Sequence, residues 1–186
     1  MIESADTVAR GRLRSGEHLL WSGRPDAGRL FNRSDIFLVP FGLFFLAFSI
    51  FWTVTAARSG GFFSLFGLLF MAVGVYYVFL RFLVKRYRQL HSTYAITDRR
   101  AFAVVGRKLI ETPISGARTT TWSGDSHVSV IWADAVGVRG FSRGQVPLNS
   151  GLDGIVSPLP MAFFDVPEPA ALMAALDQAT ARSTTT

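Results

Sequence analysis

The sequence contains no cysteine, and only three of its 186 residues are histidines. Without cysteine there are no disulfide bonds, no thiolate metal ligands and no cysteine nucleophile, which fits a reducing compartment. The histidines His18, His91 and His127 have no metal-ligand spacing such as HxxxH. We therefore predict no metal site.

Sequence motifs of catalysis are also absent. The four glutamates are dispersed, and there is no GxSxG, P-loop or GxGxxG pattern. The stretch from Ser123 to His127 contains serine, aspartate and histidine, but a hairpin turn explains residues so close in sequence better than a catalytic triad does. We predict a protein that is not an enzyme, with no catalytic residue and no cofactor.

What the chain has in abundance is apolar sequence, concentrated in two runs. Residues 36–57 and 59–80 carry no charged side chain, and Arg58 alone separates them. A helix of about 22 residues is roughly 33 Å long, enough to cross a hydrocarbon core of about 30 Å. Two buried helices of a soluble core would need more surrounding chain than is present. We predict a transmembrane hairpin over residues 36–84, with spans at about 36–57 and 60–82. It would serve as an anchor, because neither apolar run contains an Asp, Glu, Lys, Arg or His residue.

Basic residues gather at one end of this predicted hairpin. They are Arg24, Arg29, Arg33, Arg81, Lys85, Arg86 and Arg88. By the positive-inside rule, both termini are cytoplasmic and the connection at Arg58 lies outside, which predicts a multi-pass protein of the cytoplasmic (inner) membrane. Trp21, Trp52 and Tyr87 are candidate interfacial anchors. For Trp21, a short strand packed on the downstream domain is an equal alternative.

After the hairpin the pattern changes to short β-prone runs, which favour an antiparallel barrel or sandwich. The runs are 89–96, 101–105, 108–114, 117–122, 128–133 and 161–166. A helix with an apolar stripe follows from Pro167 to about Arg182. The predicted organisation is a cytoplasmic N-terminal segment (1–35), the hairpin, a cytoplasmic domain (85–182) with a long loop at 134–160, and a tail (183–186).

The order of these features along the chain resembles that of a known protein family. GEHLLWSGRP (Gly16–Pro25), a two-span hairpin, a basic junction and then YAITDRR (Tyr94–Arg100), opening a strand-rich domain, resemble bacterial membrane proteins with a pleckstrin-homology-like (PH-like) domain. In that family a Y-x-[IL]-T-[ND]-x-R turn joins the first two strands. The resemblance implies an α+β membrane protein whose transmembrane hairpin is followed by a small, partly open antiparallel β-barrel capped by the C-terminal helix. Most members have no assigned activity.

The expected function is non-catalytic scaffolding at the cytoplasmic leaflet, where the domain would tether protein partners or assemble into a homo-oligomer. The alternatives are an anionic-lipid sensor and an accessory subunit of a membrane enzyme or transporter. Nucleic acid is not expected as a partner, because the basic residues border the spans. For Arg99 and Arg100, structural pairing with Asp98 or Glu111 is the alternative to lipid binding. The candidate lipid-headgroup contacts are Arg81, Lys85, Arg86, Arg88, Arg99 and Arg100.

Overall fold

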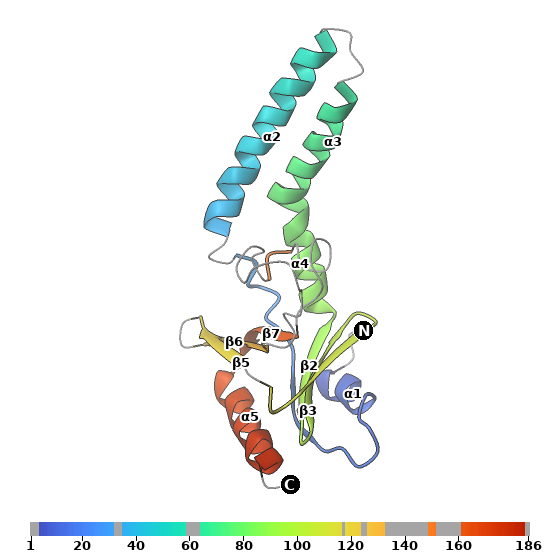
Figure 1. Cartoon of the computed structure of the whole chain (residues 1–186), viewed down its shortest axis with the longest axis vertical. Helices are drawn as coiled ribbons and strands as arrows, with labels where there is room; N and C mark the ends of the chain where they lie inside the picture. Colours follow the sequence, from blue (N-terminus) through green and yellow to red (C-terminus); the bar gives the residue numbers. More distant parts are fainter. Residues whose placement is uncertain are drawn as a thin grey trace. The chain divides into compact units, whose positions relative to one another are not determined.

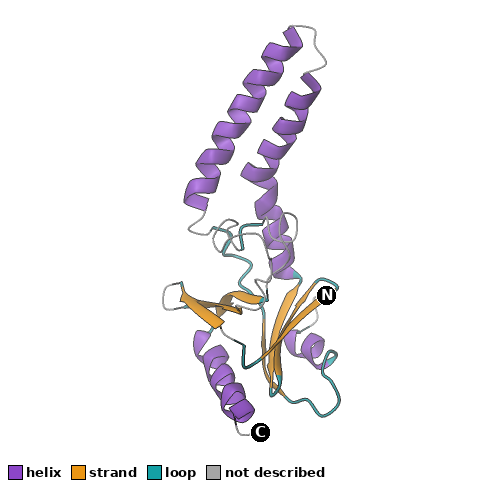
Figure 2. Ribbon diagram, viewed as in Figure 1, coloured by secondary structure: helices purple, strands orange, loops and turns teal. Residues whose placement is uncertain are grey.

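The computed structural model divides into two compact units (Figures 1 and 2). It describes residues 4–31, 35–58, 64–116, 118–123, 126–132, 149–151 and 161–184. The first unit contains Met1–Arg29, Tyr87–Gln145 and Asp153–Thr186, and the second contains Leu30–Arg86 and Val146–Leu152. Most of the predicted loop at 134–160, the turn after Arg58 and the end of the tail lie outside the described residues.

The second unit is built on the two apolar runs. Helix α2 extends from Asp35 to Arg58. Helix α3 (Ser64–Val75) continues through a π-helical turn, η1 (Tyr76–Leu80), into α4 (Arg81–Leu90). Both Asp35–Arg58 and Leu65–Leu90 are long and apolar enough to cross a membrane. Helix α4 also continues past residue 89, where the sequence predicted the start of a strand.

Two glycines allow close packing within this unit. A Cβ added to Gly74 would lie 3.0 Å from the Cα of Leu46, and one added to Gly67 would lie 3.0 Å from the Cα of Thr53. Gly67 and Gly74 are seven residues apart, so they share one face of α3. Glycines that look scattered in the sequence therefore meet at the contact between α2 and α3, as small residues do in membrane helix pairs.

Most of the other side chains on these helices face outward. In the most apolar 18-residue window of α2, only 17% is buried. In the corresponding window of Leu65–Leu90, 22% is buried. Phe44 is 73% exposed and Leu69 is 60% exposed. The described hairpin therefore presents a surface of large apolar side chains to its surroundings.

The first unit contains two antiparallel sheets. Strands β1 (Leu19–Gly23), β2 (Ser92–Thr97), β3 (Arg100–Val105) and β4 (Lys108–Pro113) form one sheet in that order. Strands β5 (Arg118–Trp122), β6 (His127–Trp132) and β7 (Ala162–Pro167) form the other. Every strand run predicted after residue 89 corresponds to one of these strands.

Strand β1 comes from the segment that the sequence analysis set apart as residues 1–35. It pairs with β2, with Trp21 opposite Ile96 and Gly23 opposite Tyr94. The Trp21 ring lies 6.1 Å from that of Phe163, centroid to centroid. The structure thus places Trp21 in a short strand packed on the domain, which was one of its two interpretations.

The described strands form two separate sheets that share one core and do not close a barrel, so the predicted partly open barrel is not confirmed. Among the described strands, β4 is an edge of the first sheet. The core joins Ile96 of the first sheet with Trp132 and Phe163 of the second. The predicted stripe on α5 (Pro169–Thr184) packs against this core through Leu172, Ala175, Leu176 and Ala179.

A second, smaller cluster lies against the first sheet. Helix α1 (Ala5–Arg10) begins at Ser4, whose hydroxyl accepts a hydrogen bond from the Thr7 N–H at 3.2 Å. Ala9 of this helix is buried with Ala95 and Phe102. The N-terminal residues from Ser4 onward thus form part of the sheet domain, not a free segment.

Candidate functional site

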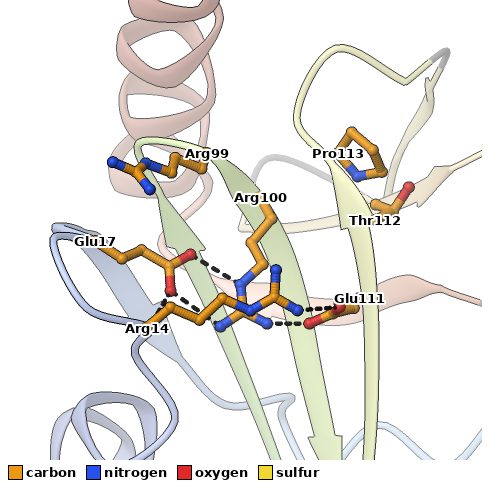
Figure 3. Close-up of a pocket in the computed structure, with 7 residues that line it drawn as sticks. All are labelled: Arg14, Glu17, Arg99, Arg100, Glu111, Thr112 and Pro113. Atoms are coloured by element: carbon orange, nitrogen blue, oxygen red, sulfur yellow. Dashed lines mark hydrogen bonds and ion pairs between the residues drawn. The ribbon is translucent and has the colours of Figure 1, made fainter.

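A polar hollow of about 280 Å³ lies in the first unit (Figure 3). Three segments line it: residues 14–17 before β1, the β2–β3 turn, and β4. Phe102 is paired with Glu111 in the β3–β4 register, so Arg100, two residues earlier on the same face, reaches Glu111 diagonally. The lining residues are Arg14, Glu17, Arg99, Arg100, Glu111, Thr112 and Pro113.

The centre of the hollow is the buried guanidinium of Arg100, which is 6% exposed. Its Nε donates to Oε1 of Glu17 at 2.8 Å, and its Nη2 donates to Oε2 of Glu17 at 3.0 Å. Nη1 donates to Oε2 of Glu111, and Nη2 also donates to the Arg12 carbonyl at 2.9 Å. The planar fork of arginine matches this two-point contact with a carboxylate.

Glu17 is the buried acid of the network, at 7% exposure. It also accepts hydrogen bonds from the Arg14 N–H and the Thr97 hydroxyl, both at 2.8 Å. Burial by itself would raise the pKa of Glu17, but the hydrogen bonds from Arg100, the Arg14 N–H and Thr97 outweigh it and lower the pKa to about 2. The carboxylate is therefore ionised across the physiological range.

Two further arginines stand at the rim. The Arg14 side chain is 64% exposed, and its Nη2 donates to Oε1 of Glu111 at 2.6 Å. The Arg99 side chain extends away from the network in Figure 3 and forms no ion pair with any described residue. Three guanidinium groups thus face two carboxylates, which leaves one positive charge in excess.

Two of the predicted headgroup contacts are buried in the second unit. Arg81 has no exposed surface. It forms an ion pair with Asp35, and its Nη1 donates to the Ser150 carbonyl at 3.3 Å. Lys85 is also buried, and its Nζ donates to the Leu30 carbonyl at 2.9 Å.

The remaining candidates are divided between two places. Arg86 is exposed and Arg88 is half-buried on α4. Arg99 lies in the β2–β3 turn and Arg100 begins β3, both at the Thr97 end of the six-residue strand β2. Such a strand is about 17 Å long. Within the first unit, the structure therefore does not bring Arg88 together with Arg99 and Arg100, and it confirms the alternative pairing of Arg100 with Glu111.

The two other predicted interfacial anchors are both exposed. Trp52 lies on α2 and is 46% exposed. Tyr87 lies on α4, and its ring is 4.2 Å from that of His91, centroid to centroid.

Sequence reasoning missed two of the acids that pair with the buried arginines, Glu17 and Asp35. Glu17 lies in the segment treated as separate from the domain, so its contact with Arg100 was not expected. The available signal was an acid directly before an apolar patch, Leu19–Trp21, between turn residues. For Asp35 and Arg81 the signal was a pair of opposite charges at the same end of a predicted hairpin.

The serine and histidine noted in the sequence do form a hydrogen-bonded chain. The Ser126 hydroxyl lies 2.8 Å from Nδ1 of His127, and Nε2 of His127 lies 3.0 Å from Oδ2 of Asp26. The Gly28 N–H, helped by His127, lowers the pKa of Asp26 against the effect of burial. These residues do not line the hollow around Arg100, and their contacts tie residues 26–28 to the start of β6.

Within the described parts of the chain, no group of three or more histidine, aspartate or glutamate side chains is placed to hold a metal ion. Comparisons with protein-family models, curated proteins and solved structures give no match.

Proposed function

We propose that this protein is a membrane-anchored, non-catalytic binding module. In this proposal α2 and Leu65–Leu90 form a hairpin in the cytoplasmic membrane. The sheet domain lies at the cytoplasmic leaflet, where it holds a protein partner or a second copy of the chain. The observation that carries the proposal is the outward-facing apolar surface of the two helices.

A core helix of a soluble protein would bury most of its apolar side chains, and these helices do not. Phe37 and Phe51 on α2 are exposed, as is Leu83 on the second helix. Removing one large apolar side chain from water is worth about 1.5–3 kcal/mol. Repeated along two helices, this favours an apolar solvent, and a lipid bilayer supplies one.

The pairing of β1 with β2 supports two crossings. Strand β1 precedes the hairpin in the chain and β2 follows it, yet the two strands are hydrogen-bonded. Hydrogen-bonded strands must lie in the same compartment, so the intervening chain crosses the membrane an even number of times. Two apolar helices meet that requirement, and the surrounding arginines favour the cytoplasm as the shared compartment.

The strand content supports a PH-like domain. Four antiparallel strands, three further antiparallel strands and a C-terminal helix share one core, and the YAITDRR stretch forms β2, the turn and the start of β3. Such a domain suits binding better than catalysis, since Glu17 and Arg100 stabilise the fold through their contacts with each other. Arg86 and Arg88 on α4 remain candidates for contact with anionic headgroups, at about 1 kcal/mol each.

The absence of cysteine gives a direct test of membrane topology. Single substitutions Arg58→Cys and Ser183→Cys would be labelled with a membrane-impermeant maleimide in bacterial spheroplasts, before and after permeabilisation. We expect Arg58→Cys to react in intact spheroplasts and Ser183→Cys only after permeabilisation. The cysteine-free parent chain is the unlabelled control. Equal labelling of both variants in intact spheroplasts, or recovery of the protein in the soluble fraction, would refute the proposal.

A further inference from the structure

We propose that the hollow bounded by Arg14, Arg99 and β4 binds a carboxylate side chain from an acidic segment of a protein partner. This inference rests on the proposed function, because it names the chemistry by which the binding module recognises what it holds. It differs from headgroup binding by Arg99 and Arg100, because it assigns the ligand to a protein.

The floor of the hollow is formed by Arg100, whose N–H donors already have partners in the protein. Arg100 donates to Glu17, to Glu111 and to the Arg12 carbonyl, so its donors are largely occupied. Its role is to position Glu111 and the β2–β3 turn. A ligand would therefore be held by the rim.

The rim supplies free donors for an anion. Arg99 makes no side-chain hydrogen bond or ion pair within the described residues, so all five of its N–H donors are available. Arg14 is mostly exposed and uses only Nη2, in a contact with Glu111 that is itself open to solvent. An entering carboxylate can therefore share Arg14 with Glu111 while it forms a two-point contact with Arg99.

The size and walls of the hollow suit an amino-acid side chain. Its volume of about 280 Å³ is below that of a typical small-molecule site. Pro113, an exposed apolar residue on β4, offers a surface for the methylene groups of a glutamate side chain. The positive charge in excess favours an acidic ligand and raises its association rate.

The position of the hollow favours a protein over a lipid. It lies at the Thr97 end of β2, and Arg88, the basic residue of α4 in the same unit, precedes the Ser92 end of that strand. A strand length of about 17 Å exceeds the Debye length of about 8 Å at physiological salt. The rim arginines therefore act on a ligand independently of Arg88.

The test uses the full chain in nanodiscs of neutral phosphatidylcholine, so that no anionic lipid competes. Binding of a fluorescent hexaglutamate peptide would be followed by anisotropy at about 150 mM salt. We expect Arg99→Gln to weaken binding roughly tenfold, the effect of one charge-assisted hydrogen-bonding group, and Arg14→Gln to weaken it less. Arg107→Gln, in the exposed β3–β4 turn, is the matched control and should change affinity less than about twofold.

Three outcomes would overturn the inference: no binding by the parent protein, equal binding by Arg99→Gln, or an equal loss in Arg107→Gln. A second experiment, without peptide, uses nanodiscs that contain phosphatidylglycerol and a protein with a fluorophore on the sheet domain. A change in fluorescence that requires both anionic lipid and Arg99 would identify the ligand as a lipid headgroup. It would refute the proposal that the ligand is a carboxylate of a protein partner. The maleimide labelling described above tests the membrane topology separately, so the proposed function and the proposed carboxylate site can each fail without the other.

Discussion

Two buried arginines, Arg100 in the sheet domain and Arg81 in the helical unit, differ in how their charge and N–H donors are compensated. Arg100 donates to two carboxylates and a backbone carbonyl. Arg81 has one carboxylate partner, Asp35, and its Nη2 has no hydrogen-bond partner among the described residues. An unsatisfied buried donor costs about 1–3 kcal/mol. The sheet site is thus the more completely satisfied of the two.

The comparison also shows what makes a basic residue structural. Arg81 and Arg100 look like surface charges in the sequence, and both were candidates for contact with lipid headgroups. Each is instead paired with an acid far away in the chain, Asp35 at a separation of 46 residues and Glu17 at a separation of 83. Whether such a basic residue is structural therefore depends on where the acid that pairs with it lies in the fold.

The largest expected effect comes from removing one member of each pair. Asp35→Leu and Glu17→Leu each leave a buried guanidinium without its main partner, which costs about 3–5 kcal/mol in the free energy of unfolding. The measurement is denaturant unfolding of the full chain in detergent micelles, followed separately by probes in each unit.

Double substitutions sharpen this contrast. Asp35→Leu with Arg81→Leu should recover most of the loss, because the unsatisfied Nη2 also disappears. Glu17→Leu with Arg100→Leu should recover less, because a second carboxylate, Glu111, loses its donor, whereas Arg81→Leu removes the donor only from the backbone carbonyls of Tyr77 and Ser150. Equal recovery at both sites would show that the number of partners is not what distinguishes them.

A second effect, of intermediate size, is pH dependence at the sheet site. The pKa of Glu17 is lowered from 4.5 to about 2, so its ionised form stabilises the folded state fully above about pH 5. As pH falls from about 5 toward 2, about 3 kcal/mol of this stabilisation is lost. Glu17→Gln should be less stable than the parent at pH 7, with a flatter pH dependence in that window. Parallel curves from denaturant titrations at each pH would contradict this assignment.

The smallest expected effect concerns the packing of α2 against α3. Gly74→Val would place side-chain atoms against Leu46, and such overpacking costs about 1–3 kcal/mol. Ala72→Val, at an exposed position on the same helix, is the control and should be nearly neutral. Thermal unfolding in micelles measures both. Equal stability of the two variants would place Gly74 outside the helix contact.

Local patterns were enough to predict the apolar helices, the strands from β2 onward and the stripe on α5, because each pattern arises within a few neighbouring residues. Strand β1 was left undecided, because it has only five residues and its partner begins about 70 residues later. The π-helical turn Tyr76–Leu80 lies inside a uniformly apolar run and has no sequence signal of its own. Two sheets could not be told from a barrel, because closure depends on pairing between edge strands. Of the hollow, the pairing of Arg100 with Glu111 was anticipated and the role of Glu17 was not.

The place of β1 in the chain has a consequence for biosynthesis. This strand leaves the ribosome first and remains without its partner until the hairpin and then β2 have been made. An unpaired strand edge of this kind is open to wrong association in the meantime. Closing so long a loop has an entropic cost that grows with its length, and a hairpin already inserted in the bilayer would shorten the effective loop by bringing its two ends together. Membrane insertion would then act as a step in the folding of the sheet domain, and a delay in insertion would prolong the time that β1 remains unpaired.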